Sequence, residues 1–214
     1  MKNLCLLLAV IFLFAQCDSG TTGKGNIITE KREVASFRAI TSEAVAEITL
    51  IQDSITSVEI KGYENLIPLT LTSVQNGVLT IETKHHIRIV GKQHIEVIIH
   101  IPSLDKIELH GVGSISTQGN FNFREIEMNL SGVGSIDVSG QAAKAILTTS
   151  GAGSIQCKNL LSDTTIATTS GVGSIRCNAI KFLKATVSGV GSITYTGDPV
   201  VEKSVSGVGS VKKE

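Results

Sequence analysis

Tryptophan is absent from this sequence of 214 residues, and aromatic residues make up only 4% of it. Net charge is absent as well, because 19 Lys and Arg balance 19 Asp and Glu. No global field would therefore attract nucleic acid or an anionic membrane surface, and we expect no nucleic-acid partner. Hydrophobic residues reach 42%, and 21 glycines accompany many Val, Ile, Thr and Ser. This composition favours strands and tight corners around a buried core, and it predicts an all-β protein.

The first apolar segment is too short to cross a bilayer. A positively charged start is followed by ten apolar residues, CLLLAVIFLF, against about 20 for a membrane-spanning helix. The run ends in LFAQC, which resembles a bacterial lipobox, although Gln16 replaces its usual small residue. We predict that residues 1–16 are a signal peptide, that Cys17 carries lipid, and that residues 17–26 form a flexible tether. An ordinary secretory peptide cut nearby, or an uncleaved anchor, is the alternative.

Six copies of one motif, GVGSI with small variations, fill the C-terminal half. Their first glycines follow one another at steps of 21, 19, 20, 18 and 18 residues, as expected of a repeat architecture. The glycine pairs are Gly111 and Gly113, Gly132 and Gly134, Gly151 and Gly153, Gly171 and Gly173, Gly189 and Gly191, and Gly207 and Gly209.

Side-chain parity suggests what the glycines do. Val133 and Ile136 are three residues apart and cannot both point inward from a straight strand. We therefore expect the glycine pair to form a corner between them, because glycine tolerates positive φ and has no Cβ to strike neighbouring copies. Each copy becomes a rung of two short strands around a bend, with Ile and Val in an internal column.

Stacking such rungs in parallel, about 4.8 Å apart, predicts a parallel β-helix, or β-solenoid, with rungs of about 20 residues over residues 110–214. The rival fold is an antiparallel meander of hairpins. It is disfavoured because an Asn-Gly hairpin signal occurs only at Asn76-Gly77. The two folds differ at Cys157 and Cys177, which occupy one position in consecutive copies. Parallel stacking makes them inward-facing neighbours close enough to bridge, although we favour buried free thiols there.

Residues 27–109 lack the motif but still contain strand-like segments, such as SVEIKGY and VLTIETK. We expect this half to cap or continue the solenoid, so that residues 27–214 form one continuous domain.

The order of segments is similar to that of a known family. REVASFRAI, EITLIQ, SVEIKGYENL, NGVLTIETK and IEVIIHIPSLDKIELHGVGSI, followed by repeated SGVGSI, resemble the head GIN domain, also called an auto-transporter adhesin domain. The resemblance covers about residues 32 to 211. It implies an exported β-helical protein, often a lipoprotein of Bacteroidota, with no established catalytic residues. It also implies adhesion as the function, without naming a ligand.

The residue after each repeat isoleucine or valine should face outward and form a stripe: Ser116, Asp137, Gln156, Arg176, Thr194 and Lys212. We name Asp137, Gln156 and Arg176 as candidate binding residues. A β-helical lyase or hydrolase would carry its acid and base on such a stripe, but Asp137 and Arg176 would lie about 10 Å apart. The glycine loops lack the third glycine of a dinucleotide site, and the repeats lack the acidic residues of a calcium β-roll, so no cofactor is expected.

A second candidate is the basic turn around Gly91, with Lys84, His85, His86, Arg88, Lys92 and His94. His85, His86 and Arg88 could contact an anion or an acidic glycan, and His86 with His94 could form a weak metal site. The alternative is a solvated basic loop that binds no ligand, and we predict no metal.

These observations favour a non-enzymatic cell-envelope lipoprotein that displays a β-solenoid, an adhesin or binding module for a glycan or a protein. We expect it to be exported and anchored by lipid to the outer membrane. The alternatives are a carbohydrate-active β-helical enzyme and a purely structural envelope spacer. The side of the membrane, the ligand and the oligomeric state are left open.

Overall fold

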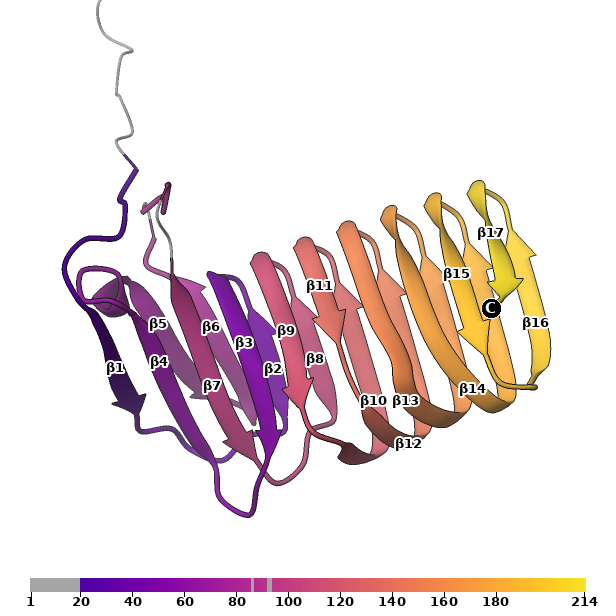
Figure 1. The fold of residues 1–214 in the computed structure, drawn as a ribbon, viewed down its shortest axis with the longest axis horizontal. Coiled ribbons are helices and arrows are strands. Elements are labelled where there is room, and N and C mark those ends of the chain that lie inside the picture. Colours follow the sequence, from indigo (N-terminus) through magenta and orange to yellow (C-terminus); the bar gives the residue numbers. More distant parts are fainter. Residues whose placement is uncertain (1–19, 86, 92–93) are drawn as a thin grey trace, which may run out of the picture.

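The structure is a computed structural model that describes residues 20–85, 87–91 and 94–214. These residues form an elongated stack of β-coils with no α-helix (Figure 1). One 3-10 turn, η1, covers Ile67–Leu69. The strands are β1 (Ile27–Arg32), β2 (Ala39–Ser42), β3 (Val45–Gln52), β4 (Ser57–Tyr63), β5 (Thr70–Gln75), β6 (Val78–Thr83), β7 (Ile95–Ile101), β8 (Lys106–Leu109), β9 (Val112–Gln118), β10 (Phe121–Leu130), β11 (Val133–Asp137), β12 (Gly140–Thr149), β13 (Ala152–Thr169), β14 (Val172–Val187), β15 (Val190–Thr196), β16 (Val200–Val205) and β17 (Val208–Lys213).

The ladders run along two long faces. Face A joins β5, β6, β2, β8, β10, β12, the second halves of β13 and β14, and β16. Face B joins β1, β4, β7, β3, β9, β11, the first halves of β13 and β14, β15 and β17. All pairings between the six repeat copies are parallel, so the predicted β-solenoid is confirmed and the antiparallel meander is wrong for this region.

A short third side, here called side C, lies where the chain returns from face B to face A. Residues 121–123 of β10 pair with residues 140–142 of β12, which pair in turn with residues 160–162 of β13. The alternation of buried and exposed residues breaks just afterwards, because Arg124 and Glu125 are both exposed. Two outward residues in succession mark the bend that separates side C from face A.

Equivalent side chains form continuous internal columns. Ile115, Ile136, Ile155, Ile175 and Ile193 are stacked in register and have no exposed surface. Cys157 and Cys177 are register partners in adjacent rungs, as predicted, and both are buried free thiols. The Cys157 thiol donates to Met128 Sδ at 3.6 Å. Burial of these columns is the main favourable contribution to folding.

The expected corner between Val133 and Ile136 is wrong. Strand β11 runs straight from Val133, so the two side chains point to opposite faces, and Val133 is 54% exposed while Ile136 is fully buried. The bend comes one step earlier, at residues 131–132. The repeat valines therefore line the outside of the corner, and only the isoleucines enter the core.

The glycines are required mainly because the rungs approach closely. A Cβ on Gly134 would lie 1.8 Å from the carbonyl oxygen of Gly113, and one on Gly173 would lie 2.1 Å from that of Gly153. Positive φ, the other expected reason, holds among the twelve repeat glycines only at Gly113 and Gly134, with 140° and 148°. The absence of a side chain, more than conformational freedom, selects glycine in this row.

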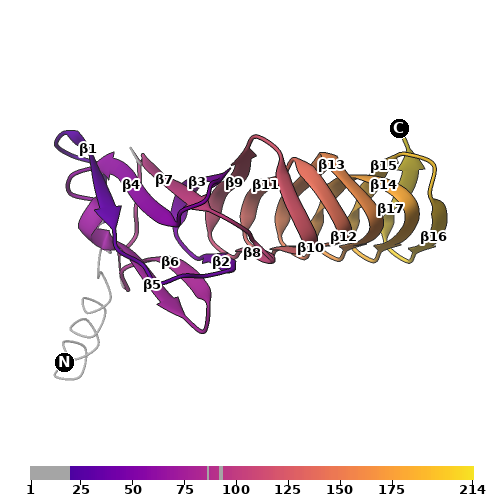
Figure 2. The ribbon, with the colours of Figure 1, turned by 90° about the horizontal axis from the view of Figure 1, so that it is seen from below.

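The N-terminal half both continues and caps the stack. Strands β2 and β3 form a rung directly before β8 and β9, with Val45 paired to Val112 and Ile48 to Ile115. Strands β6 and β7 form the rung before that. Strands β1, β4 and β5 then add in antiparallel fashion at the end of the stack (Figure 2). The Asn76-Gly77 hairpin is confirmed: both residues have positive φ and join β5 to β6.

Candidate functional site

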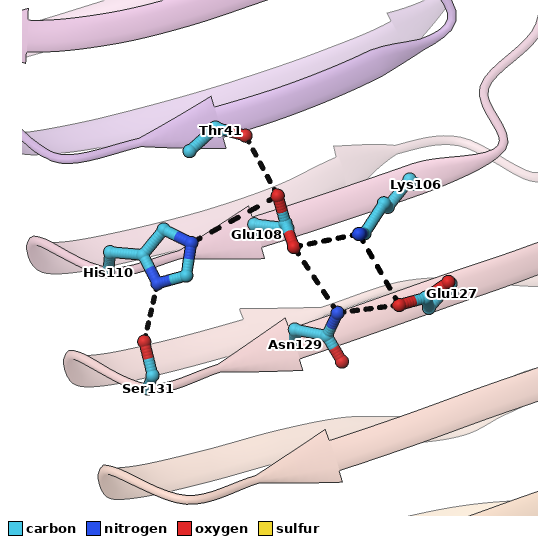
Figure 3. A network of polar contacts seen from close by, with 7 residues as sticks. All are labelled: Thr41, Lys106, Glu108, His110, Glu127, Asn129 and Ser131. Atoms are coloured by element: carbon cyan, nitrogen blue, oxygen red, sulfur yellow. Dashed lines mark hydrogen bonds and ion pairs between the residues drawn. The ribbon is translucent and has the colours of Figure 1, made fainter. Parts of the chain in front are cut away.

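A network of polar side chains lies on the outer surface of face A, across β2, β8 and β10 (Figure 3). Strand register brings these residues together. Thr41 pairs with Glu108 across the ladder of β2 and β8, and Lys106 lies two residues before Glu108 on the same face of β8. Strand β10 contributes the next row of side chains. The network consists of Thr41, Lys106, Glu108, His110, Glu127, Asn129 and Ser131.

Glu108 is the centre of this network. Its carboxylate accepts hydrogen bonds from Thr41 Oγ1 at 3.0 Å and Asn129 Nδ2 at 3.4 Å, and Lys106 Nζ lies 2.9 Å away. Partial burial raises the pKa of Glu108, but the hydrogen bonds from Lys106, Thr41 and Asn129 outweigh it and leave the pKa lowered. Lys106 has a raised pKa, chiefly through its hydrogen bond to Glu108. Both groups are therefore charged at neutral pH, and Glu108 is unsuited to donate a proton as a general acid.

Three of these residues are arranged like a nucleophilic site. His110 Nδ1 is hydrogen-bonded to Ser131 Oγ, and His110 Nε2 lies 4.0 Å from Glu108. Acyl transfer also requires donors for the developing oxyanion. The backbone N–H groups of residues 131 and 132 donate to Leu109 O at 3.0 and 2.9 Å, and that of residue 133 donates to Gly111 O at 3.0 Å. These N–H groups already donate to carbonyls of the ladder, so they do not form an oxyanion hole beside Ser131.

A hollow of about 420 Å³ adjoins the network at the bend before face A. It is lined by Arg38, Asp105, Arg124, Glu125 and Glu127. Arg38 holds Asp105 through two hydrogen bonds of 2.6 and 2.7 Å, which lower the pKa of that carboxyl. Glu125 is paired with Lys144 at 2.7 Å. Within the described part of the chain, the Arg124 side chain makes no hydrogen bond or ion pair. Its guanidinium is thus available to a ligand.

The predicted outward stripe is present, but on face B. Asp137 pairs in register with Gln156, and Gln156 with Arg176, so the three side chains follow one another along the stack. Asp137 and Arg176 are both exposed and two rungs apart, which is about 10 Å. The stripe lies apart from the face A network and has a single carboxylate, whereas glycoside hydrolysis ordinarily uses a pair. Its role in binding stays a prediction.

The basic turn packs against the start of the described chain. Thr21 N–H donates to Arg88 O at 2.7 Å, and Val90 N–H donates to Thr21 O at 2.9 Å. The side chains of His85 and Arg88 are exposed. His86 lies outside the described residues, so the predicted His86 and His94 pair is untested. In the ranges that the structure describes, no three His, Cys, Asp or Glu side chains gather as a metal site would require.

Sequence reasoning missed the face A network. The repeat register contained a signal for it, because Glu108, Asn129, Thr148, Thr168 and Thr186 share one outward column. Reading that column along the chain shows charged and amide groups giving way to threonines. The position three residues before the first glycine of each motif gives this column. Comparing its residues would have shown that the surface over β8 and β10 differs chemically from the threonine surface of the later rungs.

Comparison with known proteins supports the architecture. A putative adhesin from Bacteroides fragilis NCTC 9343 matches with TM-score 0.77 and 27% identity over 91% of this chain and 100% of that one. A putative lipid binding protein from Parabacteroides distasonis ATCC 8503 has TM-score 0.59 and 20% identity over 92% and 100%. A putative adhesin from Parabacteroides merdae ATCC 43184 has TM-score 0.55 and 21% identity over 91% and 99%. The latter two show likeness of fold alone.

No curated protein matches the sequence. A family model does, and it is described as putative auto-transporter adhesin, head GIN domain. It matches residues 36–199, which include every rung from β2 and β3 to β14 and β15. The chain therefore belongs to the head GIN domain family.

Proposed function

We propose that this protein is a non-enzymatic adhesin, a binding module for a glycan or a protein, carried on the cell envelope by lipid on Cys17. The observation that carries the binding role is the face A network with its adjoining hollow. Its charged groups are already fixed by one another on a rigid ladder, and Arg124 remains free beside them. Such preorganised polar groups bind a partner without first losing much conformational entropy. Family membership and the adhesin from Bacteroides fragilis support the same role.

The proposed anchor fits the way the chain approaches the solenoid. Residues 20–22 pack beside the loop that precedes β7, at the capped end of the stack (Figure 1). A lipid on Cys17 would therefore hold the molecule near its cap. Among the residues described by the structure, no helix has the length and apolar character needed to cross a membrane. One attached acyl chain gives weak binding and several give stable binding, so a lipidated Cys17 would suffice as the anchor.

Cys17→Ser should release the protein from membranes, because no thiol then remains at the predicted cleavage site to accept lipid. Membrane and soluble fractions of whole cells, separated after a carbonate wash, measure the change. Cys177→Val is the matched control, since that thiol is buried in the solenoid and should leave fractionation unchanged. A Cys17→Ser protein that stays in the washed membranes contradicts the anchor.

The binding role can be tested with soluble protein, residues 20–214, on arrays of glycans and of envelope and host surface proteins. We expect retention of at least one immobilised ligand, with no release of soluble fragments from it. Arg124→Ala should weaken that retention about tenfold, which is the effect of losing about 1.4 kcal/mol. Lys203→Ala removes an exposed cation from β16, at the far end of face A and outside every candidate site, and is the control. Fragment release, or equal weakening by the two variants, would contradict the proposal.

A further inference from the structure

A second hollow, of about 390 Å³, lies on side C and belongs to neither the network nor the hollow beside it. It is lined by Asn122 from β10, Gln141 from β12, Leu161 and Asp163 from β13, and Ile180 from β14. Four successive rungs thus contribute to one groove that runs along the stack. Asn122, Gln141 and Leu161 occupy equivalent outward positions on three successive rungs, which places them at the rung spacing of about 4.8 Å. Asp163 and Ile180 lie beside this column, where the register between β13 and β14 is irregular.

Two side-chain amides in this groove are available to a ligand. Asn122 and Gln141 are register partners on neighbouring rungs, and both are exposed. The backbone N–H of Asn122 donates to Gln52 Oε1 at 3.1 Å, which holds this rung in place. Neither side-chain amide makes a hydrogen bond within the part of the chain that the structure describes. Each therefore offers two N–H donors and one carbonyl acceptor at a fixed spacing.

The rest of the groove is apolar and electrically neutral. Leu161 is 43% exposed and Ile180 is 46% exposed, so two large aliphatic side chains are open to solvent within this one groove. Asp163, the groove's one carboxylate among the lining residues, is paired with Lys181 at 2.8 Å. Such a groove can hydrogen-bond the hydroxyls of a ligand and pack against its apolar C–H surface. It offers no uncompensated charge to bind an ion.

We infer that this groove binds an uncharged glycan chain that runs along the solenoid, with about one sugar residue for each rung. Asn122 and Gln141 hydrogen-bond hydroxyls of successive sugars, and Leu161 and Ile180 pack against their C–H faces. Periodicity disfavours an extended peptide, since equivalent side chains of a strand recur about every 6.6 Å and lose register with rungs about 4.8 Å apart. The rise of an extended glycan per sugar is close to the rung spacing. This site is independent of the proposed role of face A.

The test is affinity electrophoresis of soluble protein, residues 20–214, in gels containing laminarin, mannan, xylan or dextran, with polygalacturonate as the charged comparison. We expect retardation by at least one neutral polymer and about tenfold weaker binding for Gln141→Ala. Leu161→Ser, at an exposed position, should weaken binding by a similar factor. Gln75→Ala is the matched control, because it removes the same exposed amide from β5, at the capped end of the stack. Circular dichroism melting checks that all variants are folded.

The inference is overturned by retardation by none of the neutral polymers, by retardation by polygalacturonate alone, or by equal weakening by Gln141→Ala and Gln75→Ala. Binding that is lost in Arg124→Ala and kept in Gln141→Ala would place the ligand on face A. That result would support the proposed function and refute the groove on side C. Conversely, binding that only the groove variants lose would support the groove on side C, and the role of Arg124 would rest on its own test.

Discussion

Gly134→Ala is expected to lower the free energy of unfolding by about 4 kcal/mol or more, a loss that few single substitutions cause. Two effects add at this position. The new Cβ would lie 1.8 Å from Gly113 O, so adjacent rungs must separate and their ladder must weaken. The φ of 148° is also one that residues with a side chain rarely adopt. Denaturant unfolding followed by circular dichroism measures the change.

Two further glycines separate these effects. Gly173→Ala introduces the contact alone, at 2.1 Å from Gly153 O and without positive φ, and it should cost nearly as much as Gly134→Ala. Gly119→Ala introduces the backbone strain alone, at φ 84° with no atom within 4 Å of the new Cβ. It should cost only about 1 to 2 kcal/mol. If Gly119→Ala costs as much as Gly173→Ala, close approach of the rungs does not explain the repeat.

Stability should also fall steeply in alkali because of the two buried thiols. Burial raises the pKa of Cys177 from 9.0 to about 12, and burial, with a smaller effect of the neighbouring Cys177, also raises the pKa of Cys157. Below the unfolded pKa of 9.0 both states keep their protons and the thiols have no effect on the pH dependence. Above it only the unfolded chain ionises, so stability is lost as pH rises towards the folded pKa.

At about pH 10.5 each thiol should account for a loss of about 2 kcal/mol relative to about pH 8, and the pair for about 4 kcal/mol. Guanidinium unfolding at the two pH values gives the difference. The control is Cys157→Val with Cys177→Val, since Val138 occupies the same inward column one rung earlier. All other ionisable side chains are present in both proteins, so the difference between the two alkaline losses isolates the thiols. An alkaline loss that is the same in both would mean that the cysteines are bridged or exposed.

The repeat made the C-terminal half predictable. A period near 20 residues, together with identical motif cores, fixes which residues become neighbours once the rungs are parallel. Cys157 beside Cys177 and the stripe from Asp137 to Arg176 followed from counting alone. The outward position of the repeat valines did not follow, because we assumed that a valine beside glycine belongs to the core. Its exposed β-branched side chain instead occupies the first place of a straight strand.

The N-terminal rungs were harder to predict because their sequence does not preserve the motif. Ala46 stands opposite Gly113, and Glu47 opposite Ser114. A Cβ is tolerated at Ala46 because the neighbouring rung is not tightly stacked against it. A hollow of about 230 Å³ lies beside Ala46 instead. Spatial order also departs from chain order, since β6 and β7 stack outside β2 and β3. No local sequence pattern indicates that the N-terminal rungs lack the motif and still stack on the repeat. None indicates that spatial order differs from chain order.

The parallel register of the rungs is the central claim, and a distance along the stack tests it most directly. Spin labels at Ser116→Cys and Lys212→Cys would occupy one outward column, five rungs apart through Asp137, Gln156, Arg176 and Thr194. In soluble protein, residues 20–214, with Cys157→Val and Cys177→Val as background, double electron–electron resonance should give a separation of about 24 Å. A separation near 48 Å, the value for a meander with two strands in each repeat, would contradict the solenoid.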